Sequence, residues 1–180
     1  MAKKYVYFYG GGKKMTDGDR SMRELLGGKG ANLAEMSNAG VPVPPGFTVS
    51  TEACGIYEKR GSYPKEMMQQ VKKELAKLEK LEGKKLGAAK NPLFVSVRSG
   101  AAQSMPGMMD TVLNLGMNDK SVKGFIDVTG NARAGWDCYR RFIDMFGDVV
   151  MGPSSTLEHH HFEEALTSIK KKYKAKQDTD

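Results

Sequence analysis

The sequence has 180 residues, 39% of them hydrophobic and 27% charged, and a formal net charge of +7. This composition is typical of a globular protein with one domain or two small ones, large enough to bury a hydrophobic core. The lack of an apolar run of about 20 residues and of a secretory signal argues against a membrane or secreted class, so we expect no membrane partner and a cytoplasmic location.

Strands and short helices alternate over the first part of the chain. Residues 4–9 (KYVYFY) have the aromatic and β-branched side chains of a strand, and residues 47–49 form a second strand after a proline-rich turn. Between these strands, residues 31–38 are predicted to be a short helix. Thr51 is expected to cap a further helix that runs to residue 57.

The glycines before the first helix form a candidate anion site. Gly27, Gly28 and Gly30 surround Lys29, and the start of a helix offers backbone N–H groups and a positive dipole end to an anion. The spacing is not that of a Walker A loop. Without further context the pattern favours a simple turn over a phosphate site.

A long amphipathic helix is predicted over residues 64–82. Its apolar stripe consists of Met68, Val71, Leu75 and Leu78. Lysines gather here and in residues 170–176, but interleaved acidic residues at helical spacing indicate solvated helix faces. No nucleic-acid-binding motif accompanies the positive charge, and an anionic small molecule fits that charge equally well. We therefore expect no nucleic-acid partner.

The central stretch, residues 94–116, contains a second candidate anion site. A predicted buried strand over residues 93–97 ends at Arg98, and a loop of small residues that includes Gly107 leads to a strand over residues 112–115. A guanidinium and closely approaching backbone N–H groups suit phosphate oxygens. The residues alone leave a surface hairpin with an ordinary arginine equally open.

The remaining chain is predicted to be helical. Helices are expected over residues 120–128, from Asn131 as a cap, and over residues 158–173. The last two carry apolar stripes, Trp136, Tyr139, Ile143 and Phe146 on the first and Phe162, Leu166, Ile169 and Tyr173 on the second. We therefore predict an α/β (α+β) region over residues 1–116, with a small mixed sheet, and a helical subdomain over residues 117–180.

Two polar clusters in this helical part are interpreted as surface features. His159, His160 and His161 point in three directions from a helix, so they cannot close one tetrahedral metal site, and we assign no metal ligand. Arg140 and Arg141 are expected to form salt bridges on a helix surface and not a substrate clamp.

Four segments carry a resemblance to a known family. LLGGKGANLAEM (25–36), GVPVPPGFTVSTEA (40–53), VRSGAAQSMPGMMDTVLNLG (97–116) and YRRFIDMFGDVVM (139–151) closely resemble the amino-terminal nucleotide-binding region of pyruvate, phosphate dikinase. The SMPGMMDT segment distinguishes this family from its relative phosphoenolpyruvate synthase. The resemblance covers most of the chain, in the order that the family has.

The resemblance implies the amino-terminal part of an ATP-grasp domain, in which two lobes clamp ATP. Lys29 and Arg98 match the family's phosphate-binding lysine and arginine. The glycine-containing loop would place the Gly107 backbone and Thr111 nearest the nucleotide, whereas Asp110 either joins the site or only caps the next element. ATP and Mg²⁺ are the implied cofactors, with the metal ligands expected in the second lobe, outside this chain.

The resemblance also implies a reaction that this chain does not complete alone. The family converts ATP, inorganic phosphate and pyruvate to AMP, pyrophosphate and phosphoenolpyruvate, through a phosphohistidine on a separate swivelling domain. None of the 3 histidines lies in that carrier motif, so no catalytic residue is assigned here. The expected partners are the nucleotide and the remaining domains of a longer enzyme, which is expected to be a homo-oligomer. The alternatives are a non-catalytic nucleotide-binding or assembly module, or a relative of phosphoenolpyruvate synthase.

Overall fold

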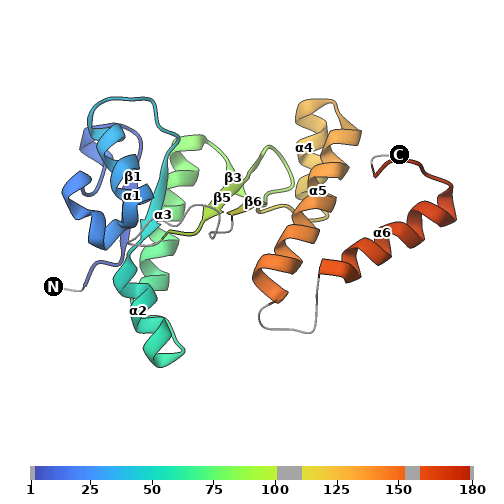
Figure 1. The fold of residues 1–180 in the computed structure, drawn as a ribbon. Coiled ribbons are helices and arrows are strands. Elements are labelled where there is room, and N and C mark those ends of the chain that lie inside the picture. The colour runs from blue at the N-terminus through green and yellow to red at the C-terminus, as the bar shows by residue number, and fades with distance from the viewer. Residues whose placement is uncertain (1–2, 101–110, 153–158, 179–180) are drawn as a thin grey trace. The chain divides into compact units, whose positions relative to one another are not determined.

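The computed structural model describes residues 3–100, 111–152 and 159–178 (Figure 1). The chain divides into two compact units, which are described separately. The first comprises Met1–Gly83 and Ser99–Met109, and the second comprises Lys84–Arg98 and Asp110–Asp180. The domain boundary expected between residues 116 and 117 falls inside the second unit, and the assignment of a separate helical subdomain from residue 117 stays a prediction.

Among its described residues, the first unit combines one β-ribbon with three α-helices. Strands β1 and β2 pair in antiparallel register, with Phe8 opposite Phe47, and α1 and α3 both pack against this ribbon (Figure 1). In chain order the elements are β1 (Val6–Tyr9), η1 (Lys13–Met15), η2 (Arg20–Met22), α1 (Arg23–Asn38), β2 (Gly46–Val49), α2 (Thr51–Arg60) and α3 (Met67–Glu82).

In the part of the second unit that the structure describes, there are two further ribbons and three α-helices. Strands β3 and β4 pair in parallel, β5 and β6 pair in antiparallel fashion, and α4 and α5 lie side by side (Figure 1). Its elements are β3 (Lys85–Leu86), β4 (Pro92–Leu93), β5 (Val95–Arg98), β6 (Thr111–Leu115), α4 (Ser121–Thr129), α5 (Ala132–Phe146), η3 (Gly147–Met151) and α6 (His159–Tyr173). Helices and small sheets thus confirm the α/β class, with the described strands arranged as separate pairs.

The aromatic strand β1 lies at the centre of the first unit. The Phe8 side chain is 0% exposed, and the Lys77 ammonium of α3 lies 3.7 Å from the centroid of its ring. The same ammonium donates to the Met15 carbonyl at 3.1 Å. A cation over an aromatic face is attracted by the ring quadrupole. Lys77 therefore joins α3 both to β1 and to the loop that follows it.

The apolar stripe predicted for α3 is only partly correct, since Leu78 is buried and Val71 packs against the core, but Met68 does not. Met68 is 45% exposed, whereas Met67, Glu74 and Leu78 are buried. The reason is Gln70, whose Oε1 accepts from the backbone N–H groups of Tyr5 at 2.7 Å and Val6 at 3.1 Å. Because this polar side chain satisfies the strand edge, the buried face is rotated relative to a purely apolar stripe.

Asp17 joins the end of the first loop to β1. Its Oδ2 accepts from the Phe8 N–H at 2.9 Å, and its Oδ1 pairs with Lys4 Nζ at 2.8 Å. Burial raises the pKa of Asp17, but the hydrogen bonds from Lys4 and Phe8 outweigh burial and hold the pKa below its ordinary value.

We predict that Asp17→Asn lowers the free energy of unfolding by about 1–2 kcal/mol at pH 7, because it removes a charge-assisted pair. A depressed carboxylate pKa stabilises the fold above the unfolded-state pKa, and this stabilisation is lost as pH falls through the folded-state pKa. Urea unfolding between pH 7 and acidic pH should show the penalty shrinking. Asp127→Asn removes an exposed carboxylate of α4 and should change little; a penalty for Asp17→Asn that does not vary with pH would contradict the assignment.

The core of the second unit lies between β6 and α5. Val112, Met117 and Phe142 are buried, and Phe94, Leu115, Phe125 and Tyr139 pack against them. The predicted cap is confirmed, because Asn131 Oδ1 accepts from the Ala134 N–H at 2.9 Å. The predicted stripe of α5 is only partly correct.

Trp136 and Ile143 of α5 are 49% and 45% exposed, contrary to the prediction. Gly135 is buried instead, and a side chain there would collide with Ile126 of α4. Close approach of the two helices at Gly135 therefore sets the rotation of α5. The buried face runs from Gly135 to Phe142, one helical position away from the predicted stripe.

Helix α6 is less buried than its apolar pattern predicts. Phe162 and Leu166 are half-buried, but Ile169 is 55% and Tyr173 is 71% exposed. Its contact with the unit is near its start, where the Phe162 ring occupies the space over Gly147. None of the helices in the described residues is both long and apolar enough to span a membrane.

Candidate functional site

Lys29 lies just after a break in α1. Gly27 has φ 68 and ψ 169, a conformation outside the helical region, so a new helical segment begins at Gly28. The prediction placed the helix start at residue 31; the structure carries it back to Arg23 and makes Gly28 and Gly30 helical. This conformation of Gly27 is essentially restricted to glycine. The glycine therefore allows the break that puts Lys29 in the first turn of a helical segment.

Contacts from β2 and α2 hold this segment. A Cβ on Gly30 would lie 2.8 Å from the side chain of Thr48, so the helix approaches β2 as closely as a glycine permits. Thr51 Oγ1 donates to the Glu24 carbonyl at 2.7 Å. Thr51 is thus not the predicted cap; Ser50 occupies the cap position, and its side chain makes no capping hydrogen bond.

The Lys29 ammonium is exposed and donates to the Ser99 carbonyl at 2.8 Å, within the first unit. This contact between residues 70 positions apart in sequence was not predicted, because no sequence pattern marks a backbone carbonyl as a partner. At a helix start, the charge of the lysine ammonium and the positive end of the helix dipole lie close together. Such an arrangement suits an anion.

Arg98 and Thr111 are brought together as register partners of β5 and β6. Arg98 is exposed, and the neighbouring Val97 is 49% exposed. Of the strand predicted to be buried over residues 93–97, only Leu93 is therefore buried. The reason is that β5 belongs to a two-stranded ribbon. The buried side chain of this ribbon is Val112, which belongs to the other strand, β6.

Two predicted residues, Gly107 and Asp110, lie outside the described residues. Lys29 belongs to the first unit, whereas Arg98 and Thr111 belong to the second. The convergence of these groups on one phosphate chain stays a prediction.

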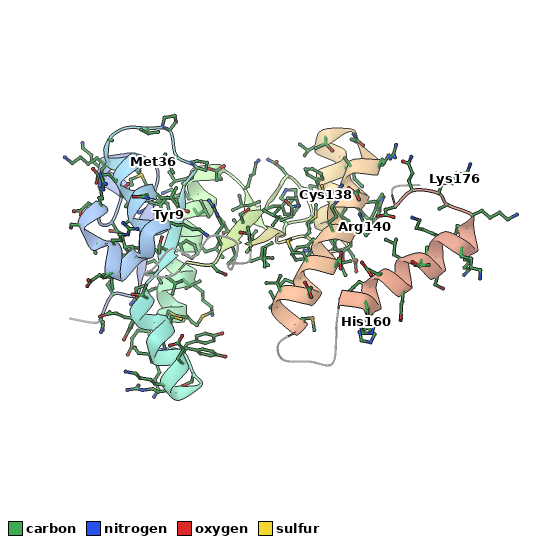
Figure 2. All side chains as sticks on the ribbon, viewed as in Figure 1. Tyr9, Met36, Cys138, Arg140, His160 and Lys176 are labelled. Carbon is green, nitrogen blue, oxygen red and sulfur yellow. The ribbon has the colours of Figure 1, made fainter. Side chains whose placement is uncertain are left out.

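The two polar clusters of the helical part, as far as the structure describes them, lie on helix surfaces. Arg140 and Arg141 pair with Asp137 at 2.9 Å and 2.6 Å, which confirms the predicted salt-bridged helix surface; Figure 2 shows Arg140 on α5. His160 and His161 are exposed, with ring centroids 4.0 Å apart. Within the described ranges no three His, Cys, Asp or Glu side chains gather as a metal site would require.

Comparison with known proteins agrees with the resemblance. Residues 23–62, which include Lys29, match the family model described as pyruvate phosphate dikinase, AMP/ATP-binding domain. The chain is 51% identical to pyruvate, phosphate dikinase of Rhizobium meliloti, with 98% of this chain and 19% of the relative aligned. The corresponding enzyme of Giardia intestinalis is 49% identical, with 100% of this chain and 20% of the relative aligned. That of Clostridium symbiosum is 50% identical, with 98% and 19% aligned.

The chain thus spans about a fifth of the length of the curated relatives that it matches. This agrees with the expectation that it corresponds to part of a longer enzyme. The chain is therefore similar over almost its entire length to part of the pyruvate, phosphate dikinases, and its residues 23–62 match the AMP/ATP-binding domain of that family.

Proposed function

We propose that this chain supplies phosphate-binding groups to the ATP site of a pyruvate, phosphate dikinase. The observation that carries the proposal is the position of Lys29, at the start of a helical segment and inside the matched AMP/ATP-binding domain. Arg98, Thr111 and the backbone of Gly107 are the other proposed ligands. The three relatives compared above are all dikinases, which favours a dikinase over phosphoenolpyruvate synthase.

The proposed role is binding and charge neutralisation. Phosphoryl transfer depends on positioning the nucleotide and on compensating the negative charge of its phosphates. The Lys29 ammonium would exchange the Ser99 carbonyl, now at 2.8 Å, for a phosphate oxygen. The Arg98 guanidinium can offer two parallel N–H donors to the oxygens of a phosphate group. Thr111, which could offer its hydroxyl, is the register partner of Arg98 in the ribbon.

The complete reaction would require the rest of the enzyme. In the proposed scheme, ATP, inorganic phosphate and pyruvate give AMP, pyrophosphate and phosphoenolpyruvate, and the phosphoryl group passes to a histidine outside this chain. The described residues do not fit a Mg²⁺ site, since no cluster of carboxylates is found among them. We assign the metal no step here. Homo-oligomer formation and a cytoplasmic location stay predictions.

ATP titration of the 180-residue chain, followed by NMR, tests this proposal. We expect Lys29→Ala and Arg98→Ala each to weaken binding by about tenfold or more, because each removes a charged partner of phosphate. Arg140→Ala is the matched control, since that guanidinium pairs with Asp137 at 2.9 Å. Equal losses for all three variants, or a wild-type spectrum that ATP leaves unchanged, would refute the site.

A non-catalytic assembly module is the second candidate. The exposed Trp136 and Ile143 on α5 favour it, because large apolar side chains on one helix face often mark a contact surface. This reading predicts that the chain self-associates and that ATP leaves the Lys29 and Arg98 signals unmoved.

A further inference from the structure

The guanidinium of Arg23 lies over the start of the helical segment that carries Lys29. A Cβ built on Gly28 would be 3.7 Å from both Arg23 Nε and Nη2. Gly28 directly precedes Lys29, so the Arg23 guanidinium and Lys29 both lie at the first turn of the helical segment that begins at Gly28. The absence of a side chain at Gly28 leaves the guanidinium beside the helix backbone.

The Arg23 side chain is not held by a polar contact within the described residues. It is exposed, and no hydrogen bond or ion pair joins it to another residue in the described ranges. By contrast, Arg140 and Arg141 of α5 both pair with Asp137. The backbone beneath Arg23 is nevertheless fixed, because Thr51 donates to the carbonyl of the next residue, Glu24, at 2.7 Å.

Two cationic residues lie near helix starts in this region. Arg23 is in the first turn of α1, together with the acidic residue Glu24, and Lys29 is in the first turn after the break at Gly27. Cations near helix N-termini oppose the helix dipole, whereas anions complement it. A bound polyanion would reverse the sign of both interactions, and the fork of N–H donors on arginine matches phosphate oxygens.

We propose that Arg23 is a further phosphate ligand of the nucleotide site, contacting the same phosphate chain as Lys29. This inference rests on the proposed function, and it adds a residue that the sequence patterns did not single out. The proposed contact requires glycine at position 28, because a bulky side chain there would separate the Arg23 guanidinium from the anion bound at the helix start.

The test compares Arg23→Gln with Arg20→Gln in the 180-residue chain, titrated with ATP and with inorganic tripolyphosphate at one salt concentration. Arg20 is the matched control, because it lies in η2 just before α1 and is also exposed. Arg23→Gln is expected to weaken binding of both probes about tenfold. Arg20→Gln is expected to change it less than twofold, and the melting temperatures should stay equal to that of the wild type.

A double-mutant cycle with Lys29→Ala adds a second readout, because two ligands of one phosphate chain are expected to give non-additive losses. If Arg23→Gln binds like the wild type while Lys29→Ala binds weakly, the inference fails and the proposed function stands. Equal losses for Arg23→Gln and Arg20→Gln would also overturn the inference, since only net charge would matter. A wild-type chain that binds neither probe overturns both.

Discussion

Phe8→Ala is expected to lower the free energy of unfolding of the first unit by about 3–5 kcal/mol, the usual loss for a fully buried aromatic side chain. Phe8 is 0% exposed, and truncation would remove the ring that lies beneath the Lys77 ammonium, 3.7 Å away. The strand β2, which faces Phe8 through Phe47, also carries Thr48, the neighbour of Gly30. The variant should therefore loosen the support of Lys29.

Hydrogen exchange of α3 amides as a function of urea is the appropriate measurement. The single tryptophan, Trp136, lies in the second unit and would not report on the first. Phe8→Leu should cost less, roughly 1 kcal/mol, because it conserves most of the apolar volume. Met68→Ala, at a side chain of α3 that is 45% exposed, should be nearly neutral. A loss below about 1 kcal/mol for Phe8→Ala would contradict the burial of this ring.

Local signals in the sequence predicted the elements well, because each depends on neighbouring residues. The aromatic run gave β1, and Asn131 caps α5 as expected. The faces of the helices were less predictable, because tertiary contacts decide them. Gln70 looks like a solvent residue until its hydrogen bonds to β1 are known. Gly135 looks like a weak point in a helix until α4 is seen to approach it.

In the candidate site, too, some residues follow from local sequence patterns and others depend on tertiary structure. The glycines around Lys29 singled it out as a candidate, and its role as a ligand stays a prediction; the pairing of Arg98 with Thr111 follows from a hairpin between two strands. Arg23 carried no signal, because an exposed arginine in a first helical turn is common and its position depends on the conformation of Gly27. Spacing in sequence cannot report a break in a helix that only backbone angles define.

Gly27→Ala is the variant in which stability and binding should fall together. With φ 68 and ψ 169, Gly27 is in a region that costs a residue with a Cβ about 1–3 kcal/mol. Alanine would also favour an unbroken helix through this position, because it has the highest helix propensity. A straightened helix would rotate Arg23 relative to Lys29 and pull the Glu24 carbonyl away from Thr51.

Gly55→Ala provides the matched control, because Gly55 is inside α2 and a Cβ there would meet nothing within 4 Å. That substitution should be neutral or stabilise by up to about 1 kcal/mol. For Gly27→Ala we expect a loss of about 2–3 kcal/mol in urea unfolding and an affinity for ATP reduced about tenfold. If the stability falls but ATP affinity does not, the break supports the fold alone, and the alignment of Arg23 with Lys29 has no part in binding.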